Sequence, residues 1–244
     1  MPDDARVHLS FAPLGDRALL VEVGEALDPV VTARVRTVAA RITARALRGV
    51  TDVVPAFCSV ALHYDPGALR DRSGEKTPYD ALVEQLQELL AEVADAEPVE
   101  GRLFEIPVVY GGAFGEDLAP LAQARGLAPE QVAEIHCAQT YSVYMLGFAP
   151  GFGYLGPVDE RLRQPRREMP RTRVVAGSVA LANAFTGIYP MELPGGWHVI
   201  GRTPWRLFDV ERNPPALLAA GDRVRFVPIT PAEFDVAAAR QPWR

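Results

Sequence analysis

Residues 147–156 read GFAPGFGYLG, and the last six of them have the spacing G-x-G-x-x-G. In a dinucleotide-binding fold, such glycines join a strand to a helix whose first amides hold the pyrophosphate, and an acidic residue follows roughly 20 positions later. Here Pro157 and Pro165 interrupt the segment after the glycines, and residues 174–176 contain no acid. Because a lone G-x-G-x-x-G is weak evidence, the sequence predicts a loop of another kind.

The same loop carries three aromatic side chains, Phe148, Phe152 and Tyr154, among residues that favour turns. Glycine permits positive φ and close backbone approach, and Pro150 fixes a turn. Large apolar side chains are costly to leave in water. The loop therefore either packs its rings on its own domain or lines a pocket or an interface, and its composition leaves both interpretations open.

The composition is that of an ordinary globular protein. The chain has 244 residues, of which 48% are hydrophobic and 23% charged, and this length suits one large domain or two small ones. We find no run of 18 uncharged apolar residues and no basic flank followed by an apolar stretch at the amino terminus, so we expect no membrane span and a cytoplasmic location. The net charge of −6 argues against nucleic acid as the main partner.

Cysteine and histidine usage argues against a metal site. The two cysteines, Cys58 and Cys137, fit no metal-binding spacing, and a disulfide is not expected in a reducing compartment. The four histidines are scattered along the chain. We therefore predict that this chain holds no metal through its own side chains.

Lysine usage excludes several chemistries. Lys76 is the only lysine among 25 basic residues, and it lies in the polar stretch DRSGEKTPYD. Walker A phosphate loops, pyridoxal Schiff bases and biotinyl carriers each need a lysine in another setting. None of the three is expected within this chain.

The first part of the chain alternates between strand-like and helix-like patterns. We expect two helices, one with Asp28 as N-cap and one starting near Pro78. The order β-β-α-β-β-α predicts a small α+β domain over 1–97, a sheet with both helices on one face. The expected strands cover residues 7–11, 18–23, 50–54 and 59–64.

The second part of the chain, 98–244, has a different pattern of apolar residues. A strand at 103–109 is followed by two short helices at 117–124 and 129–137. Beyond these, short apolar runs separated by Gly and Pro predict a closed or sandwiched all-β domain with long loops. The runs cover residues 174–175, 179–182, 198–200, 207–208 and 223–227.

Several long stretches, taken together, resemble the 5-oxoprolinase B-subunit family, also called allophanate hydrolase subunit 1, a carboxyltransferase-domain family that includes an inhibitor of a sporulation histidine kinase. They are GDRALLVEVG at 15–24, PAFCSVALHYDP at 55–66, IPVVYGGAFGEDL at 106–118, the glycine-rich loop, TGIYPMELPGGWHVIGRTPWRLFD at 186–209 and GDRVRFVPI at 221–229. The resemblance covers nearly the whole chain. It implies an α+β N-terminal domain followed by an all-β cyclophilin-like barrel domain with two short helices.

The resemblance also implies a function. It indicates the B subunit of an ATP-dependent 5-oxoprolinase, which opens the lactam 5-oxo-L-proline to L-glutamate together with the A and C subunits. ATP would be a co-substrate bound with these partners, with Mg as a possible companion. Two alternatives share the same motifs and stay open, namely a histidine-kinase inhibitor and a carboxyltransferase-like subunit that acts on urea or a related amide.

The chain departs from the family pattern at three places. Asn183-Ala-Phe185 stands where Gly-Gly-Gln is usual, Leu193 replaces a serine, and Gly153 replaces a proline in the aromatic loop. A polar amide has thus become an aromatic ring. These changes leave the identity of the substrate open, whereas the expected fold is unaffected.

An arginine cluster is the first group of candidate site residues. It comprises Arg161, Arg163, Arg166, Arg167, Arg171 and Arg173, all within thirteen residues. Guanidinium groups bind phosphate or carboxylate through paired hydrogen bonds, so we expect Arg166, Arg167 and Arg171 to bind substrate. The alternative is a surface stretch or an arginine–acid interface with a partner polypeptide.

The remaining candidates lie near the aromatic loop or in similar turn-rich segments. His136 is the histidine closest to the start of that loop and is a candidate general base, although a structural histidine is the open alternative. Arg202 is the second candidate catalytic residue. Phe148, Phe152, Tyr154, Thr186, Tyr189 and Trp197 are candidate substrate-binding residues. We expect these segments to meet at one face of the barrel, in a site shared with the C subunit.

Overall fold

A computed structural model of the chain describes residues 9–25, 29–70, 75–91 and 101–241. Backbone contacts divide the chain into two compact units, Met1–Glu100 and Gly101–Arg244. The predicted domain boundary after residue 97 lies outside the described residues and stays a prediction, as does Asp28 as a helix N-cap.

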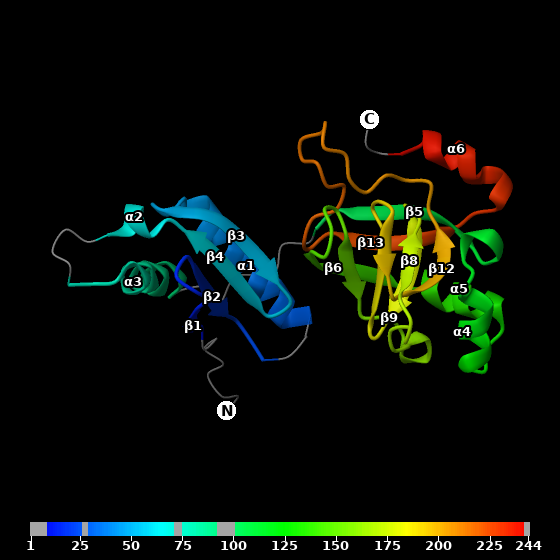
Figure 1. Cartoon of the computed structure of the whole chain (residues 1–244), viewed down its shortest axis with the longest axis horizontal. Helices are drawn as coiled ribbons and strands as arrows, with labels where there is room; N and C mark the ends of the chain where they lie inside the picture. The colour runs from blue at the N-terminus through cyan, green and yellow to red at the C-terminus, as the bar shows by residue number, and fades with distance from the viewer. Residues whose placement is uncertain (1–8, 26–28, 71–74, 92–100, 242–244) are drawn as a thin grey trace, which may run out of the picture. The chain divides into compact units, whose positions relative to one another are not determined.

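The first unit is a four-stranded antiparallel sheet in the order β1-β2-β4-β3, accompanied by helices (Figure 1). β1 and β2, which overlap the first two expected strands, pair as an antiparallel hairpin. The short helix α2 was not predicted. The elements are β1 Ser10–Pro13, β2 Ala18–Glu22, α1 Pro29–Arg45, β3 Val50–Ala56, β4 Ser59–Tyr64, α2 Pro66–Leu69 and α3 Pro78–Leu90.

One hydrophobic cluster holds this unit together. Buried side chains alternate along β2 (Leu19, Val21) and β4 (Val60, Leu62), so they lie on one face of the sheet. Both long helices contribute to the same cluster, α1 through residues such as Ile42. The helices therefore cover a single face, as the alternation of the sequence predicts.

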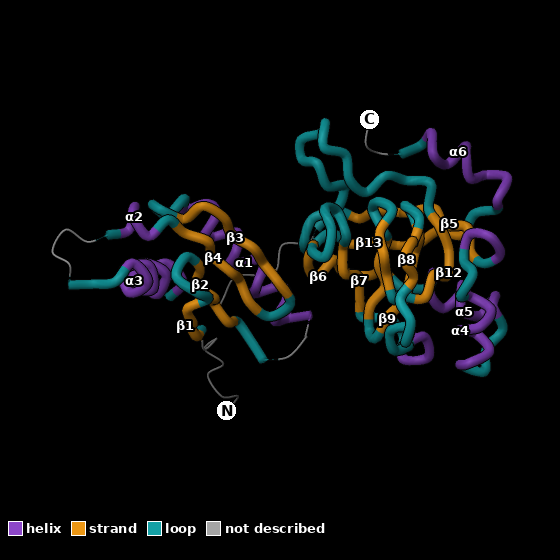
Figure 2. The backbone as a smooth tube through the Cα atoms, viewed as in Figure 1, coloured by secondary structure: helices purple, strands orange, loops and turns teal. Residues whose placement is uncertain are grey.

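The second unit is built around a closed barrel of seven strands in the order β10-β7-β6-β13-β5-β12-β9 (Figure 2). β8 and β11 form a separate two-stranded ribbon. The strands are β5 Leu103–Tyr110, β6 Thr140–Leu146, β7 Gly153–Gly156, β8 Arg171–Val174, β9 Ser178–Ala182, β10 Phe185–Ile188, β11 Leu193–Gly195, β12 His198–Arg202 and β13 Arg223–Pro228. The prediction of a closed β domain is confirmed.

The barrel closes through a pairing between distant parts of the chain. β13 lies between β5 and β6 and runs parallel to β5, from Arg223 opposite Leu103 to Pro228 opposite Val108. The other strand pairs of the barrel are antiparallel. Ile106 and Phe226, from the parallel pair, are fully buried in the core of the unit.

The helices of the second unit correct one prediction. α4 (Leu118–Ala124) and α5 (Pro129–Cys137) occur where two short helices were expected, and they lie side by side next to the barrel (Figure 1). A third helix, α6 (Phe234–Ala239), was missed because its contacts are distant in sequence: the Phe114 and Phe234 rings pack at 5.1 Å. None of the described helices has both the length and the apolar character needed to cross a bilayer.

The G-x-G-x-x-G stretch does not open a helix. Residues Gly153–Gly156 form β7, which pairs with β6 and β10 as part of the barrel wall. Gly151 precedes the strand at φ 80°, a left-handed conformation that glycine adopts without strain. The prediction that this stretch is not a dinucleotide-binding turn is confirmed.

Candidate functional site

The aromatic loop and three other segments meet in one small pocket of about 70 Å³. Six of the predicted site residues line it, so the sequence identified most of its side chains. The lining residues are Phe148, Phe152, Tyr154, Arg166, Tyr189, Gly195, Gly196 and Trp197.

A larger cleft of about 1040 Å³ lies between the start of β5 and residues 205–217. Five of its twelve lining residues are charged, among them Arg102, whose guanidinium pairs with Asp222, and none of the predicted site residues lines it. Size alone therefore does not mark the site. The small pocket is the better candidate because apolar rings and an arginine converge there.

Phe152 is the centre of the aromatic wall. Its side chain is 1% exposed, and its ring packs edge-to-face at 5.2 to 5.5 Å against Phe148, Tyr154, Tyr189 and Trp197. Edge-to-face packing of this kind adds stability beyond the buried area and fixes the ring positions. The wall is thus a preformed apolar surface.

Phe148 has a different position at the same pocket. Its side chain is 61% exposed, and its backbone has φ 70°, in the left-handed region that a bulky residue rarely adopts. Such strain persists only where the surroundings impose it and is common at binding sites. The conformation places an apolar ring at the edge of the pocket, within 6.3 Å of the Tyr189 ring.

Arg166 is the only charged side chain among the lining residues. It is exposed and forms no hydrogen bond or ion pair with another described residue. Its positive charge acts on another lining residue, Tyr189. Burial raises the pKa of Tyr189, and the charge of Arg166 partly offsets this rise. An aromatic wall beside a free guanidinium suits a small ligand with an apolar body and a carboxylate.

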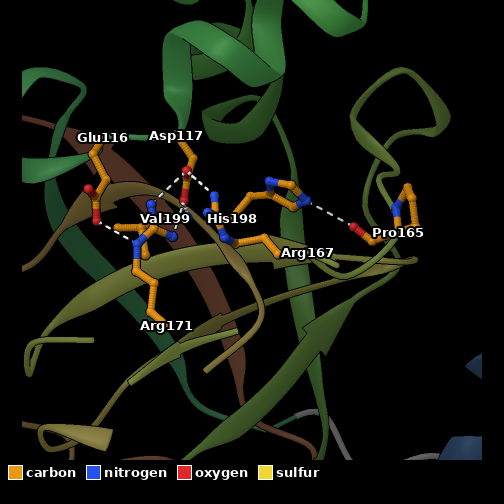
Figure 3. A network of polar contacts seen from close by, with 7 residues as sticks. All are labelled: Glu116, Asp117, Pro165, Arg167, Arg171, His198 and Val199. Carbon is orange, nitrogen blue, oxygen red and sulfur yellow. Dashed lines mark hydrogen bonds and ion pairs between the residues drawn. The ribbon is translucent and has the colours of Figure 1, made fainter. Parts of the chain in front are cut away.

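A polar network around Asp117, just before α4, includes residues that adjoin the pocket lining in sequence (Figure 3). The Asp117 carboxylate accepts hydrogen bonds from Arg167 at 2.7 Å, from Arg171 at 2.8 Å to each oxygen, and from the Val199 amide at 2.7 Å. Glu116 forms a further ion pair with Arg171 at 2.9 Å. Every oxygen of this buried carboxylate therefore has at least two donors.

The charge state of Asp117 follows from these contacts. Burial alone would raise the pKa of its carboxyl group. The hydrogen bonds from Arg171 and the Val199 amide, together with the charges of Arg171 and Arg167, outweigh burial and lower the pKa below its usual value. Asp117 is thus an anion that neutralises its arginine partners.

These contacts revise the expected roles of the arginine cluster. Arg167 and Arg171 were expected to bind substrate, but their guanidinium groups are committed to Asp117 and neither lines the pocket. One alternative placed an acid partner on another polypeptide, whereas the acid that binds Arg167 and Arg171 lies within this chain. Three further members also form ion pairs, Arg161 with Asp159, Arg163 with Glu160 and Arg173 with Glu192, which leaves Arg166 as the exception among the described residues.

His136 and Thr186 lie together in the barrel core, away from the pocket lining. Both side chains are fully buried; the His136 ring stacks on Phe226 with centroids 4.5 Å apart. Thr186 Oγ1 donates to the Ala180 carbonyl at 3.2 Å, so it accepts from His136 Nε2 at 2.9 Å.

The other ring nitrogen of His136, Nδ1, then accepts from the Tyr110 hydroxyl at 2.7 Å. Burial lowers the pKa of His136 to about 3, which keeps the ring neutral. With both nitrogens engaged and no exposed surface, the geometry favours the structural role over the catalytic one.

Arg202, the second candidate catalytic residue, lies on β12 outside the pocket lining. Its guanidinium donates to the Ala113 carbonyl at 3.2 Å and lies 5.2 Å from the centre of the Phe114 ring. These contacts attach the Gly112–Phe114 turn to the barrel. The structure does not bring Arg202 together with the aromatic residues.

The departures from the family pattern lie around the pocket and not in its lining. Phe185 packs edge-to-face at 6.0 Å against Tyr144 and against Tyr154, so it supports a pocket residue from outside the lining. Leu193 packs against the buried cluster that contains Phe152. Both replacements increase the apolar packing around the aromatic wall.

The sequence missed Asp117, Gly195 and Gly196 as parts of the site. Asp117 follows the glycine-rich turn YGGAFG and precedes a helix, which was the available signal for an anion in a defined position. Gly195 is required by close packing, since a Cβ there would lie 2.1 Å from the Tyr189 hydroxyl. Only the folded chain shows that contact.

Comparison with known proteins identifies the class. A family model for the carboxyltransferase domain, subdomains C and D, matches residues 9–218. The urea amidolyase of K. lactis has a similar fold, with a TM-score of 0.73 over 99% of this chain and 16% of that chain at 21% identity. The fold is therefore that of a carboxyltransferase domain.

Two curated relatives refine this result. The 5-oxoprolinase B subunit of Bacillus subtilis is 41% identical over 93% of this chain and 96% of that protein. The protein of the same name from Escherichia coli O157:H7 is 51% identical over 64% of this chain and 71% of that protein. Among solved structures, TTHA0988 has a TM-score of 0.74 and 36% identity over 87% of this chain, which spans 40% of the TTHA0988 chain.

The chain belongs to the carboxyltransferase subdomain C and D family and, within it, to the 5-oxoprolinase B-subunit family. The resemblance seen in the sequence motifs is confirmed.

Proposed function

We propose that this chain is the B subunit of an ATP-dependent 5-oxoprolinase and that its aromatic pocket binds the substrate. 5-Oxoproline combines a small five-membered lactam ring with a carboxylate. The observation that carries the proposal is the pocket itself, which is lined by five aromatic side chains and by an arginine that no described residue neutralises. Arg166 would hold the carboxylate, and the ring would pack on the aromatic wall.

The pocket also explains why other polypeptides are needed. Opening a lactam requires an activated water, and the lining residues include no carboxylate and no histidine that could act as a general base. Apolar side chains remain exposed on the same segments, Phe148 at 61% and Met169 at 80%. Both features fit a site completed by the C subunit, and the A subunit is the further partner.

ATP does not fit the described residues of this chain. A triphosphate carries several negative charges, whereas the pocket offers one arginine and the arginines near it are paired with acids. Within the described ranges, no group of three His, Cys, Asp or Glu side chains is arranged to hold a metal ion. We therefore assign ATP, and any Mg, to the partner subunits, and place the complex in the cytoplasm, where ATP is supplied.

We further propose a two-domain arrangement for this chain, in which an α+β domain is followed by a barrel of the cyclophilin-like type. Urea is neutral, so a pocket whose free group is a cation fits it less well than it fits an anionic lactam.

The test is glutamate release from 5-oxoproline and ATP. We expect no turnover by this chain alone, turnover with the A and C subunits, and a loss of about tenfold to a hundredfold in kcat/KM for Arg166→Met, which removes a charge-assisted hydrogen bond. Arg163→Met is the matched control, since Arg163 belongs to the same segment but pairs with Glu160 at the surface. Turnover by the isolated chain, or none with both partners, would contradict the proposal.

A further inference from the structure

One buried carboxylate, that of Asp117, binds residues next to two of the segments that line the pocket. Asp117 contacts both the segment that carries Arg166 and the strand that follows the Gly195–Trp197 side of the pocket (Figure 3). These two pieces of chain are far from Asp117 in sequence, so the carboxylate is the point at which three segments meet.

Arg166 is fixed through its two neighbours. The Pro165 carbonyl accepts a hydrogen bond from His198 Nε2 at 2.9 Å. The Arg167 amide donates to the Gly196 carbonyl at 2.8 Å, and the Arg167 side chain donates to Asp117. The backbone is therefore held on both sides of Arg166, while the Arg166 side chain itself stays free of described partners.

The glycine side of the pocket is fixed to the same carboxylate. Asp117 and Val199 exchange two hydrogen bonds, since the Asp117 amide donates to the Val199 carbonyl at 2.9 Å and the Val199 amide donates to the carboxylate. Arg171, which binds both carboxylate oxygens, is opposite Gly195 in the β8–β11 ribbon. A shift of Asp117 would thus move both sides of the pocket.

The network also decides which cation is available to a ligand. Arg166, Arg167 and Arg171 are close in sequence and carry the same charge, so any of them could attract a carboxylate. Asp117 neutralises Arg167 and Arg171 and leaves Arg166 as the unpaired cation of the pocket lining. Without that anion, two further guanidinium groups from the same part of the chain would compete for the ligand.

We infer that Asp117 is a positioning residue for substrate binding, which acts through Arg166 by holding the 165–171 segment and by neutralising Arg167 and Arg171. The inference rests on the proposed function, in which Arg166 binds the carboxylate of 5-oxoproline. It assigns to the Asp117 network a role beyond stability.

The first test measures kinetics in the assembled complex with the A and C subunits. Asp117→Asn keeps the size of the side chain but removes its charge, and Arg167→Gln is a milder change that leaves the Asp117–Arg171 pair. We expect Asp117→Asn to raise KM for 5-oxoproline on the order of ten- to a hundredfold, with a much smaller effect on kcat, because a misplaced binding group weakens substrate capture. Arg167→Gln should also raise KM with little effect on kcat, but by a smaller factor.

Two comparisons separate positioning from simple stability. In an Arg166→Met background, Asp117→Asn should raise KM further by less than about twofold, since the loss that it causes passes through Arg166. Glu192→Gln, which breaks the exposed Arg173–Glu192 pair of the same ribbon, should leave KM unchanged. An unchanged KM in Asp117→Asn, or an effect that multiplies fully with Arg166→Met, would overturn the inference.

A crystal structure of the Asp117→Asn variant provides a readout that does not depend on turnover. We expect the 165–171 segment to move and the Arg166 guanidinium to leave the pocket lining. If Arg166 stays in place, the inference is overturned even when the complex is active. If the wild-type complex releases no glutamate but Arg166 moves as expected, the proposed function fails while the positioning role of Asp117 stands.

Discussion

Acid should destabilise the second unit through one buried side chain, His136. Its pKa is lowered to about 3 by burial, whereas an unfolded histidine titrates near 6.5. Above pH 6.5 the ring is neutral in both states, so it adds no pH dependence. As the pH falls from about 6.5 to about 3, His136 becomes protonated in the unfolded chain but stays neutral in the folded chain. The free energy of unfolding therefore decreases over this range.

The size of this effect follows from the two pKa values. Each pH unit in the window lowers the free energy of unfolding by about 1.36 kcal/mol, which is about 2 kcal/mol at pH 5 and at most about 5 kcal/mol below pH 3. A loss of this size is comparable with the whole free energy of unfolding of a small domain. His136 therefore sets a lower pH limit for the barrel.

The assay is urea unfolding at pH 7.5 and pH 5, followed by tryptophan fluorescence. All three tryptophans lie after residue 100, so the signal reports the second unit. His136→Gln keeps an acceptor for Tyr110 and a donor for Thr186 but cannot titrate. Because it loses the ring stack on Phe226, it should be less stable than wild type at pH 7.5, and that deficit should shrink by about 2 kcal/mol at pH 5.

The control is His63→Gln, which removes an exposed histidine of β4 in the first unit. It should leave the pH dependence of the fluorescence transition as in wild type. An equal deficit of His136→Gln at both pH values would refute the reasoning, because it would mean that the buried ring does not titrate differently in the folded and unfolded states.

Two further predictions concern packing and binding. Asp222→Ala should lower the free energy of unfolding by about 2 to 4 kcal/mol in the same assay. The reason is that the buried Asp222 carboxylate accepts hydrogen bonds from the Ala219 amide at 2.8 Å and from the Arg102 guanidinium at 2.6 Å. A loss below about 1 kcal/mol would contradict this prediction. Gly195→Ala should weaken 5-oxoproline binding at least about tenfold in calorimetry with the assembled complex, since its Cβ would lie 2.1 Å from the Tyr189 hydroxyl. Gly196→Ala is the control, because its nearest contact would be an ordinary 3.6 Å, and equal losses in both variants would contradict the argument.

Local sequence patterns were sufficient for the strands and long helices of the first unit and for the aromatic part of the pocket, whereas they missed α2, α6 and several barrel strands. Alternating burial along β2 and β4 follows directly from the apolar pattern, and Pro129 marks the start of α5. The aromatic loop was expected to line a pocket or pack on its own domain, and Phe152 and Phe148 show that it does both. In each case the decisive residues are neighbours in sequence.

The missed features depend on contacts between distant residues. Asp117 bonds Arg167 and Arg171 across 50 and 54 positions, so the arginine cluster looked like a set of free cations. His136 meets Thr186 across 50 positions, and its burial depends on barrel closure. No local periodicity records such contacts, since they form only when the fold brings segments that are distant in sequence together.

The most direct measurement compares two ligands of the assembled complex, 5-oxoproline and 2-pyrrolidinone, which is the same lactam without the carboxylate. Wild type should bind 5-oxoproline at least about tenfold more tightly, because the carboxylate gains charge-assisted hydrogen bonds from Arg166. In Arg166→Met the two affinities should become nearly equal. A preference for 5-oxoproline that survives in Arg166→Met would show that the carboxylate is bound elsewhere and would contradict the assignment of this pocket.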